Sequence, residues 1–216
     1  MKIRIILADD HRIVREGLRA ILVDQPGWEI VAECGDGRSA VDEALRLKPD
    51  VVVLDLVMPD LNGIEAARQI VQGTRSTRVV ALSMHTDRRY VTRMLKAGAR
   101  GYLPKDCAGE ELVAAINAVV AGKRYLSPGL PSVSAQSVGG LKDGGPATAY
   151  EVLTAREREV LQCFAEGHST KEVAALLGLK VKTIEAHRAH IVEKLGVRSM
   201  ADLTRYAIQE GLVSLE

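Results

Sequence analysis

Three aspartates, a serine and a lysine in this sequence form a set that could handle a phosphoryl group. They are Asp9, Asp10, Asp55, Ser83 and Lys105, and each ends or follows a short apolar run. A carboxylate that attacks a phosphoryl group forms an acyl phosphate, so Asp55 is the candidate nucleophile. Crowded carboxylates resist ionisation unless a cation offsets them, and Mg2+ is the hard divalent ion that prefers oxygen ligands. Lys105 would supply a fixed positive charge and Ser83 a hydroxyl hydrogen bond to the phosphoryl oxygens.

These residues fall at strand ends because apolar strand-like runs alternate with helical patterns along the first half of the chain. The predicted strands are 3–8, 29–33, 51–56, 79–83 and 101–103, and the predicted helices lie near 13–23, 39–47, 64–71, 88–97 and 110–121. Such alternation predicts an α/β fold with a parallel sheet and right-handed crossovers, in the flavodoxin-like doubly wound order. In that fold the active crevice lies beyond the carboxyl ends of the strands, which would bring the aspartates together. The alternative is three solvated aspartates at loop starts.

The composition changes between the two halves of the chain. Residues 126–149 are rich in proline, glycine and serine, which predicts a flexible linker because such a segment buries too little apolar surface to offset its ordering entropy. Only helical patterns follow. We therefore predict an α/β domain at 1–125 and a separate all-α domain at 150–216.

The motifs of the first part resemble the receiver domain of two-component response regulators over about residues 1–125. The resemblance rests on Asp9-Asp10, the stretch Asp55–Gly63, Ser83, and the stretch Gly101–Lys105. It implies a (βα)5 fold with a five-stranded parallel sheet. It also implies that Asp55 accepts a phosphoryl group from the phosphohistidine of a sensor histidine kinase, assisted by Ser83 and Lys105.

The resemblance further implies a metal site and a switch. Asp9, Asp10, Asp55 and the backbone carbonyl of Val57 would hold Mg2+. Ser83 and Tyr102 would be the switch pair, in which the hydroxyl moves toward the phosphoryl group and the aromatic ring turns inward. The alternative for Tyr102 is a strand tyrosine that only packs its ring.

Val57 and His85 lie near the expected phosphoryl site and would influence how water reaches it. An apolar Val57 would slow dephosphorylation. Pro104 precedes Lys105, whereas many receivers carry a proline after the lysine.

Two capping boxes predict helix starts in the second part of the chain. Thr154 with Glu157, and Ser169 with Glu172, both match the pattern in which a hydroxyl residue precedes a glutamate by three positions. A third helix is predicted at 182–195, and the three helices would end near Gly167, Gly178 and Gly196. Two short helices joined by a glycine-containing turn form a helix-turn-helix, whose second helix enters the DNA major groove.

The third helix has an apolar face and a polar face. Ile184, His187, Ile191 and Leu195 recur at helical spacing and are predicted to pack inward, so that His187 is a packing residue and not a metal ligand. The opposite face and its flanks supply candidates for contacts with bases and phosphates. These candidate DNA-binding residues are Lys171, Lys180, Lys182, Thr183, Glu185, Ala186, Arg188 and Ala189.

The stretches 153–161, 171–174 and 183–187 resemble the LuxR-type effector domain, and with this receiver the whole chain resembles the NarL/FixJ class of regulators. The resemblance implies four helices, with the last, near 200–211, serving dimerisation. Leu203, Tyr206 and Ala207 are the candidate dimer contacts. The alternative is a helix that closes its own core. Lys180 stands where the family usually opens the recognition helix with serine or threonine.

Composition restricts the remaining classes of function. The net charge is +1, so overall charge does not indicate a nucleic-acid partner. The apolar runs are too short to cross a membrane. The positive charge is local, because residues 180–198 hold five basic residues against two acidic ones. Cys34, Cys107 and Cys163 are scattered without the spacing of a zinc site, which favours a reducing, cytoplasmic compartment.

The sequence as a whole predicts a transcription regulator controlled by phosphorylation, and not an enzyme beyond assisting its own phosphorylation and dephosphorylation. The predicted partners are a sensor histidine kinase, double-stranded DNA and a second copy of the phosphorylated chain, with RNA polymerase as a further candidate and with no membrane. One alternative is a phosphotransfer enzyme with Asp9 as nucleophile, although the sequence lacks the Asp-x-Asp spacing of such phosphatases. The other is a protein-binding regulator whose helix-turn-helix does not contact DNA.

Overall fold

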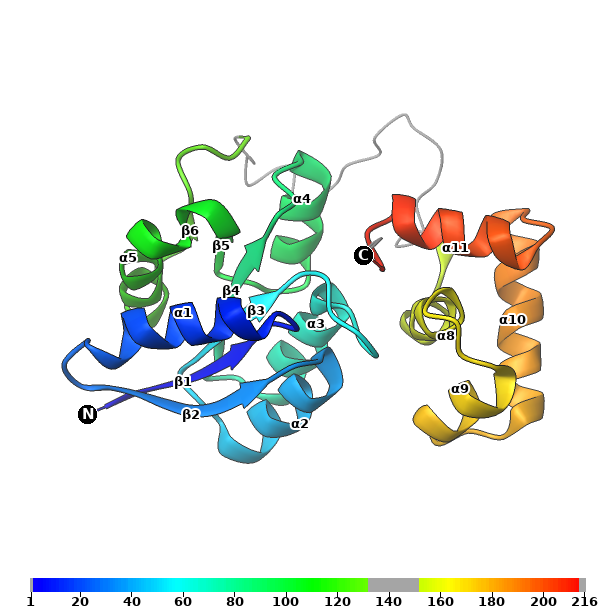
Figure 1. Ribbon diagram of the computed structural model, residues 1–216, viewed down its shortest axis with the longest axis horizontal. Coiled ribbons are helices and arrows are strands. Elements are labelled where there is room, and N and C mark those ends of the chain that lie inside the picture. Colours follow the sequence, from blue (N-terminus) through cyan, green and yellow to red (C-terminus); the bar gives the residue numbers. More distant parts are fainter. Residues whose placement is uncertain (1, 132–151, 214–216) are drawn as a thin grey trace. The chain divides into compact units, whose positions relative to one another are not determined.

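The computed structural model describes residues 2–131 and 152–213. Most of the predicted linker, residues 132–149, lies outside the described residues. The described part forms two compact units, an α/β unit within 2–131 and a helical unit within 152–213, which are considered separately (Figure 1).

The first unit is built on a parallel sheet with strand order β2-β1-β3-β4-β5-β6. Its central strands are apolar and buried on both faces, as expected for a sheet covered by helices on each side. The strands are β1 (Ile3–Ala8), β2 (Trp28–Cys34), β3 (Val51–Asp55), β4 (Arg78–Ser83), β5 (Gly101–Pro104) and β6 (Tyr125–Leu126). The first five agree with the predicted strands to within one residue at each end.

Two layers of helices cover the sheet (Figure 1). Helices α1 and α5 pack together on one face, where Leu18 and Leu22 of α1 and Leu112 and Ile116 of α5 join the buried side chains of the central strands. Helix α3 packs between α2 and α4 on the other side. The bounds are α1 (Arg12–Val23), α2 (Gly37–Leu47), α3 (Gly63–Gly73), α4 (Arg88–Lys96) and α5 (Ala108–Val120), with a 3-10 turn η1 (Lys105–Cys107) between β5 and α5.

The prediction of a five-stranded sheet was wrong by one strand, because β6 pairs in parallel with β5. The backbone N–H of Ser127 donates to the carbonyl of Tyr102 at 3.1 Å. The Glu111 carboxylate of α5 accepts hydrogen bonds from the hydroxyls of Tyr125 and Ser127, each at 3.0 Å. The first residues of the predicted linker are therefore held on the first unit by α5 and by the open edge of β5.

The second unit consists of helices α8 (Ala155–Ala165), α9 (Thr170–Leu176), α10 (Val181–Leu195) and α11 (Met200–Gln209). Both predicted capping boxes are present, at Thr154 for α8 and at Ser169 for α9. The three predicted stops also appear, since Gly167, Gly178 and Gly196 adopt positive φ angles of 90°, 63° and 65° that favour glycine. An apolar core that includes Val160, Leu161, Phe164, Val173, Ile184, Ile191 and Leu203 joins the four helices.

No helix in the described ranges is both long enough and apolar enough to span a bilayer.

Candidate functional site: an acidic crevice and a helix-turn-helix

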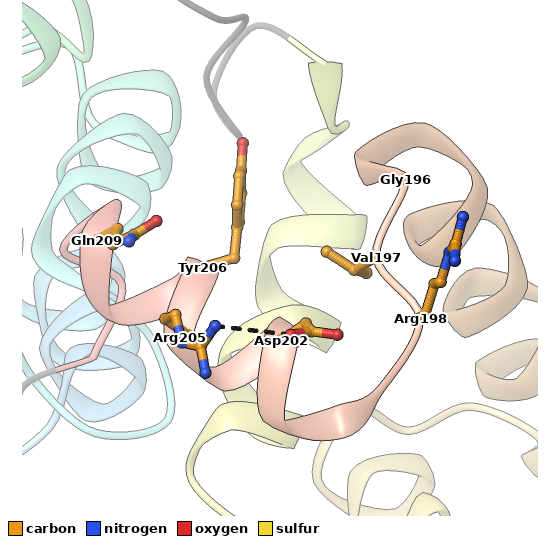
Figure 2. Close-up of a pocket in the computed structure, with 7 residues that line it drawn as sticks. All are labelled: Gly196, Val197, Arg198, Asp202, Arg205, Tyr206 and Gln209. Atoms are coloured by element: carbon orange, nitrogen blue, oxygen red, sulfur yellow. Dashed lines mark ion pairs between the residues drawn. The ribbon is translucent and has the colours of Figure 1, made fainter.

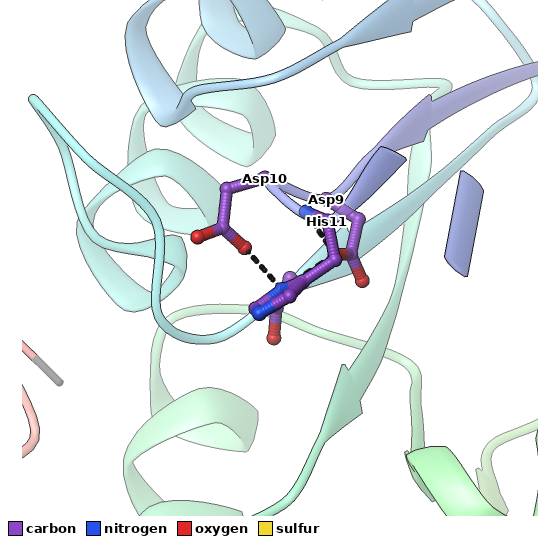
Figure 3. A group of neighbouring side chains, drawn as sticks. Asp9, Asp10 and His11 are labelled. Atoms are coloured by element: carbon purple, nitrogen blue, oxygen red, sulfur yellow. Dashed lines mark hydrogen bonds and ion pairs between the residues drawn. The ribbon is translucent and has the colours of Figure 1, made fainter. Parts of the chain in front are cut away.

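The predicted carboxylates meet at the carboxyl edge of the sheet. Asp9 and Asp10 follow β1, and Asp55 is the last residue of the neighbouring strand β3. Ligand atoms of these three residues and of His11 all lie within 4.8 Å of one another. Figure 3 shows Asp9, Asp10 and His11 converging, with the His11 Nδ1 2.8 Å from Asp10 Oδ1. The pattern of strand ends did not indicate a role for His11.

Lys105 provides the positive charge of this crevice. Its Nζ lies 2.7 Å from Asp9 Oδ2 and 2.7 Å from Asp55 Oδ2, so one ammonium group bridges two carboxylates from different strands. The lysine reaches this place because η1 begins directly after β5, at the same edge of the sheet. The structure therefore brings together the nucleophile and the fixed cation that the sequence predicts.

The charges of the crevice are incompletely balanced. The pKa of Asp55 is raised from its ordinary value of 3.8 to about 6, chiefly by burial and also by the nearby Asp9 carboxylate, although the Lys105 ammonium acts in the opposite direction. Three carboxylates against one lysine form an oxygen-rich donor set with surplus negative charge, which fits a hard divalent cation. Asp9, Asp10 and Asp55 are the residues whose side-chain oxygens could hold such an ion.

The loop after β3 is shaped by a glycine. The Gly63 N–H donates to the Leu56 carbonyl at 2.8 Å, which closes the loop back onto the strand end. A Cβ at Gly63 would lie 1.9 Å from the Asp55 carbonyl oxygen, so no other residue fits without moving the backbone. This close approach keeps Asp55 and the following residues, Val57 among them, at the strand tip.

Ser83 and Tyr102 lie on adjacent strands and are both buried. The Ser83 Oγ accepts a hydrogen bond from the His85 N–H at 2.9 Å, and the Tyr102 hydroxyl donates to the His85 carbonyl at 2.5 Å. The His85 ring in turn stacks on Tyr90 of α4, with centroids 4.5 Å apart. Burial raises the pKa of the Tyr102 hydroxyl, although the Ser83 hydroxyl acts in the opposite direction.

The Tyr102 ring is therefore buried in this structure, so it points inward and not toward solvent. Through His85 and Tyr90, the tyrosine, the serine and α4 form one connected group. The sequence singled out His85 only for its nearness to the phosphoryl site, and it gave no signal for Tyr90.

In the second unit, α9 and α10 form the predicted helix-turn-helix. Ile184 and Ile191 are buried, and His187 and Leu195 are partly buried, which confirms the inward face of α10. The eight candidate DNA-binding residues named above are all exposed. Their side chains are thus available for contacts with a duplex.

Two contacts that the sequence did not predict hold α10 in place. The Lys194 Nζ lies 2.6 Å from Glu157 Oε2, which joins the end of α10 to the start of α8. The Arg188 guanidinium lies 5.7 Å from the centre of the Phe164 ring, within the range of a cation–π contact. Arg188 therefore has a positioning role in addition to its candidate role in DNA contact.

The candidate dimer contacts on α11 have different environments. Leu203 and Ala207 are buried in the core of the unit, which favours the alternative that this part of the helix closes its own core. Tyr206 is partly buried and borders a hollow of about 330 Å³ that extends along α11 and the segment before it (Figure 2). The same hollow is lined by Asp202 and Arg205, which form an ion pair of 3.8 Å.

A doubly wound sheet with three aspartates and a lysine at its carboxyl edge, combined with a separate helix-turn-helix unit, defines the class of two-component response regulators. Comparison with known proteins agrees. Residues 5–117 match the family of response regulator receiver domains, and residues 151–207 match the luxR family of bacterial regulatory proteins. The chain therefore belongs to the response regulators that carry a LuxR-type DNA-binding domain, a family of transcription regulators, as the resemblance to the NarL/FixJ class predicts.

The similarity to individual proteins extends over nearly the whole chain. The transcriptional regulatory protein DegU of Brevibacillus brevis is 34% identical over 227 residues, which cover 99% of this chain and 96% of the relative. A structure of the RcsB response regulator of Salmonella typhimurium matches with a TM-score of 0.64 and 27% identity, covering 99% of each chain. A structure of two RcsB dimers bound to two parallel DNAs matches with a TM-score of 0.56 and 27% identity, covering 95% of this chain and 98% of that one.

Proposed function

We propose that Asp55 accepts a phosphoryl group from the phosphohistidine of a sensor histidine kinase, and that this event controls dimerisation and sequence-specific DNA binding. The observation that carries the proposal is the position of Asp55 at a strand tip, bridged by Lys105 to Asp9. We propose a receiver domain at 1–125 and a DNA-binding domain at 150–216. The linker between them would span 126–149, and its first residues pair with the sheet. Because the DNA and the kinase's phosphohistidine are both cytoplasmic, we assign the protein to that compartment.

The chemistry needs one bond to form and one to break. An oxygen of Asp55 forms the new P–O bond while the P–N bond of the phosphohistidine breaks, and the histidine leaves with the bond's electron pair. Mg2+, held by Asp9, Asp10, Asp55 and the Val57 carbonyl, would supply positive charge to the phosphoryl oxygens. Lys105 offsets negative charge on the same oxygens, since its ammonium already lies against Asp55.

Ser83 and Tyr102 would transmit the effect of Asp55 phosphorylation to the protein surface. The Ser83 oxygen accepts from the His85 N–H, so its hydroxyl hydrogen can donate to a phosphoryl oxygen. Movement of Ser83 would pull on His85, whose carbonyl holds the Tyr102 hydroxyl and whose ring packs on Tyr90. We propose that phosphorylation shifts an existing equilibrium between arrangements of this group.

DNA recognition would use α10 in the major groove. Lys182, Thr183, Glu185, Ala186 and Ala189 are the proposed contacts with base edges. The proposed phosphate contacts are Lys171, Lys180 and Arg188, with Lys182 able to serve either role. Two effector units on two half-sites would raise the affinity. The related protein RcsB has been seen as dimers bound to DNA, which supports binding as a dimer. Tyr206, which is only partly buried, is the remaining candidate for the dimer contact.

The test is selection of operators from random duplexes by the full chain, with and without beryllofluoride and Mg2+. We expect enrichment of a sequence with two half-sites that depends on beryllofluoride in the wild type and is lost in Asp55→Ala. Lys182→Ala should weaken binding to the selected duplex, whereas Lys123→Ala, which removes an exposed lysine of the first unit, should not. Failure to enrich any duplex in either state would favour a regulator that binds protein, and identical enrichment by Asp55→Ala would refute control by phosphorylation.

A further inference from the structure

Four arginines surround a hollow at the edge of the sheet opposite to the acidic crevice. Arg78 begins β4, and Arg100 and Arg124 directly precede β5 and β6. Because these strands are parallel, their starts meet at the amino edge, whereas Asp55 and Lys105 lie at the carboxyl edge. With Arg75 from the loop before β4, these arginines border a space of about 200 Å³, here called the arginine hollow.

The positive charge of the arginine hollow has no counterpart in the described residues. No aspartate or glutamate of the described ranges lines it. The side chains of Arg75, Arg100 and Arg124 are exposed, and none has a hydrogen bond or ion pair with any part of the chain that the structure describes. Four like charges around one space create a local positive potential that attracts an anion.

A purely structural role accounts for only one of the four arginines. Helices α3 and α4 end beside the hollow, and basic side chains stabilise the free carbonyls at such ends. Arg78 serves the turn between α3 and β4, since its guanidinium donates to the carbonyls of Arg75 at 3.1 Å and Ser76 at 2.9 Å. These two bonds also hold the Arg78 guanidinium in place at the hollow. Within 2–131 and 152–213, the other three guanidinium groups bond no carbonyl.

The size and lining of the hollow restrict the ligand. Its volume is below the roughly 300 Å³ at which sites for drug-sized ligands begin, so the ligand must be compact. Guanidinium groups match phosphate geometry with two parallel hydrogen bonds. One phosphate group carries about −1.5 to −2 charges at neutral pH, so two linked phosphates are needed to balance four arginines.

We infer that the arginine hollow is a binding site for a small ligand with two linked phosphate groups, the class that includes pyrophosphate and the diphosphate end of a nucleotide. Arg78 is held in position for one phosphate group. Arg75, Arg100 and Arg124 come from segments that converge on the same space and would close on the ligand. Because the site lies at the opposite edge of the sheet from Asp55, its occupancy does not compete with phosphorylation.

The test is a calorimetric titration of the full chain with sodium pyrophosphate in a buffer of low ionic strength that contains EDTA. We expect saturable binding with one site per chain, weakened by added salt. Arg100→Gln and Arg124→Gln should each weaken it about tenfold, the usual worth of a hydrogen bond to a charged group. Arg89→Gln is the matched control, because Arg89 is an exposed arginine of α4 outside the hollow, and its affinity should equal that of the wild type.

Two further measurements separate this site from other anion sites. Asp55→Asn should bind pyrophosphate as the wild type does, and the amide NMR signals of Gly98 and Ala99, which line the hollow, should shift on titration. No saturable binding, equal loss in Arg89→Gln, or equal affinity for orthophosphate would overturn the proposal. So would a loss of affinity for duplex DNA in Arg100→Gln without any pyrophosphate binding by the wild type, because the hollow would then be a DNA contact.

Discussion

Replacing Asp55 by asparagine is expected to stabilise the first unit at neutral pH when no divalent cation is present. The wild-type carboxylate is buried, and its pKa is raised from 3.8 to about 6. A tenfold change in an acid dissociation constant corresponds to about 1.4 kcal/mol, so ionised Asp55 lowers the free energy of unfolding by about 3 kcal/mol. This figure already includes the attraction of Lys105, which in the variant keeps its ion pair of 2.7 Å with Asp9.

The sign of the pH dependence follows from the same shift. Between pH 4 and pH 6 the folded state binds the Asp55 proton more tightly than the unfolded state does. The stability of the wild type should therefore fall as pH rises through this range, and the full penalty of about 3 kcal/mol should be present above it. Asp55→Asn removes this component, so the difference between variant and wild type should grow from near zero at pH 4 to its full value at pH 7.

The assay is urea unfolding followed by fluorescence. The single tryptophan, Trp28, lies in β2, so its emission reports the unfolding of the first unit alone. Asp42→Asn is the matched control, because Asp42 is exposed on α2 and its removal should change stability by less than about 0.5 kcal/mol. Added Mg2+ should narrow the gap by stabilising the wild type. An Asp55→Asn protein no more stable than the wild type at pH 7, or a gap independent of pH, would refute the electrostatic account of the crevice.

Three further changes test other parts of the structure. Ser169→Ala removes the cap of α9 and should lower the stability of the second unit by about 1 kcal/mol in denaturant unfolding followed by circular dichroism, and an unchanged midpoint would contradict the role of the capping box. Glu111→Ala releases the residues after β5, so the amide of Ser127 should exchange with deuterium about tenfold faster, whereas an unaltered rate would show that Glu111 does not hold it. Burial raises the pKa of Glu157, but its hydrogen bonds with Lys194 and Thr154 and the nearby Lys194 charge together outweigh burial and hold the pKa below the ordinary 4.5. The contribution of this lowered pKa to stability is complete above pH 4.5 and is lost as pH falls through the lowered pKa. Lys194→Met should therefore make the loss of stability with falling pH less steep. The same slope in both proteins would show that the Lys194–Glu157 pair does not cause it.

Local patterns were enough to predict the elements that carry the site. Strands buried on both faces are nearly continuous apolar runs, so their ends, and with them Asp9, Asp55 and Ser83, could be located from the sequence. The capping residues Thr154 and Ser169 act on backbone groups three residues away, so the helix starts in the second unit were also predictable. These features depend on interactions between near neighbours in the chain or on the periodicity of one element.

Other features depend on contacts between residues that are distant in the sequence, and no local pattern predicts them. The Tyr125–Leu126 pair is too short to predict as a strand, and it becomes β6 only because β5 offers an open edge and Glu111 accepts two hydroxyls. The His85–Tyr90 stack and the Lys194–Glu157 ion pair likewise join side chains whose approach is set by packing.

The sequence by itself determined the class of fold, the order of its elements and the residues that end up at the strand tips, because the periodicity of apolar side chains and the hydrogen bonds of helix caps act over short stretches of chain. Only the tertiary structure decided that Tyr102 lies inward, that the chain after Tyr125 stays on the sheet, and that four arginines border one hollow. Those outcomes depend on which surfaces remain open after the core has packed, and this is a property of the whole fold.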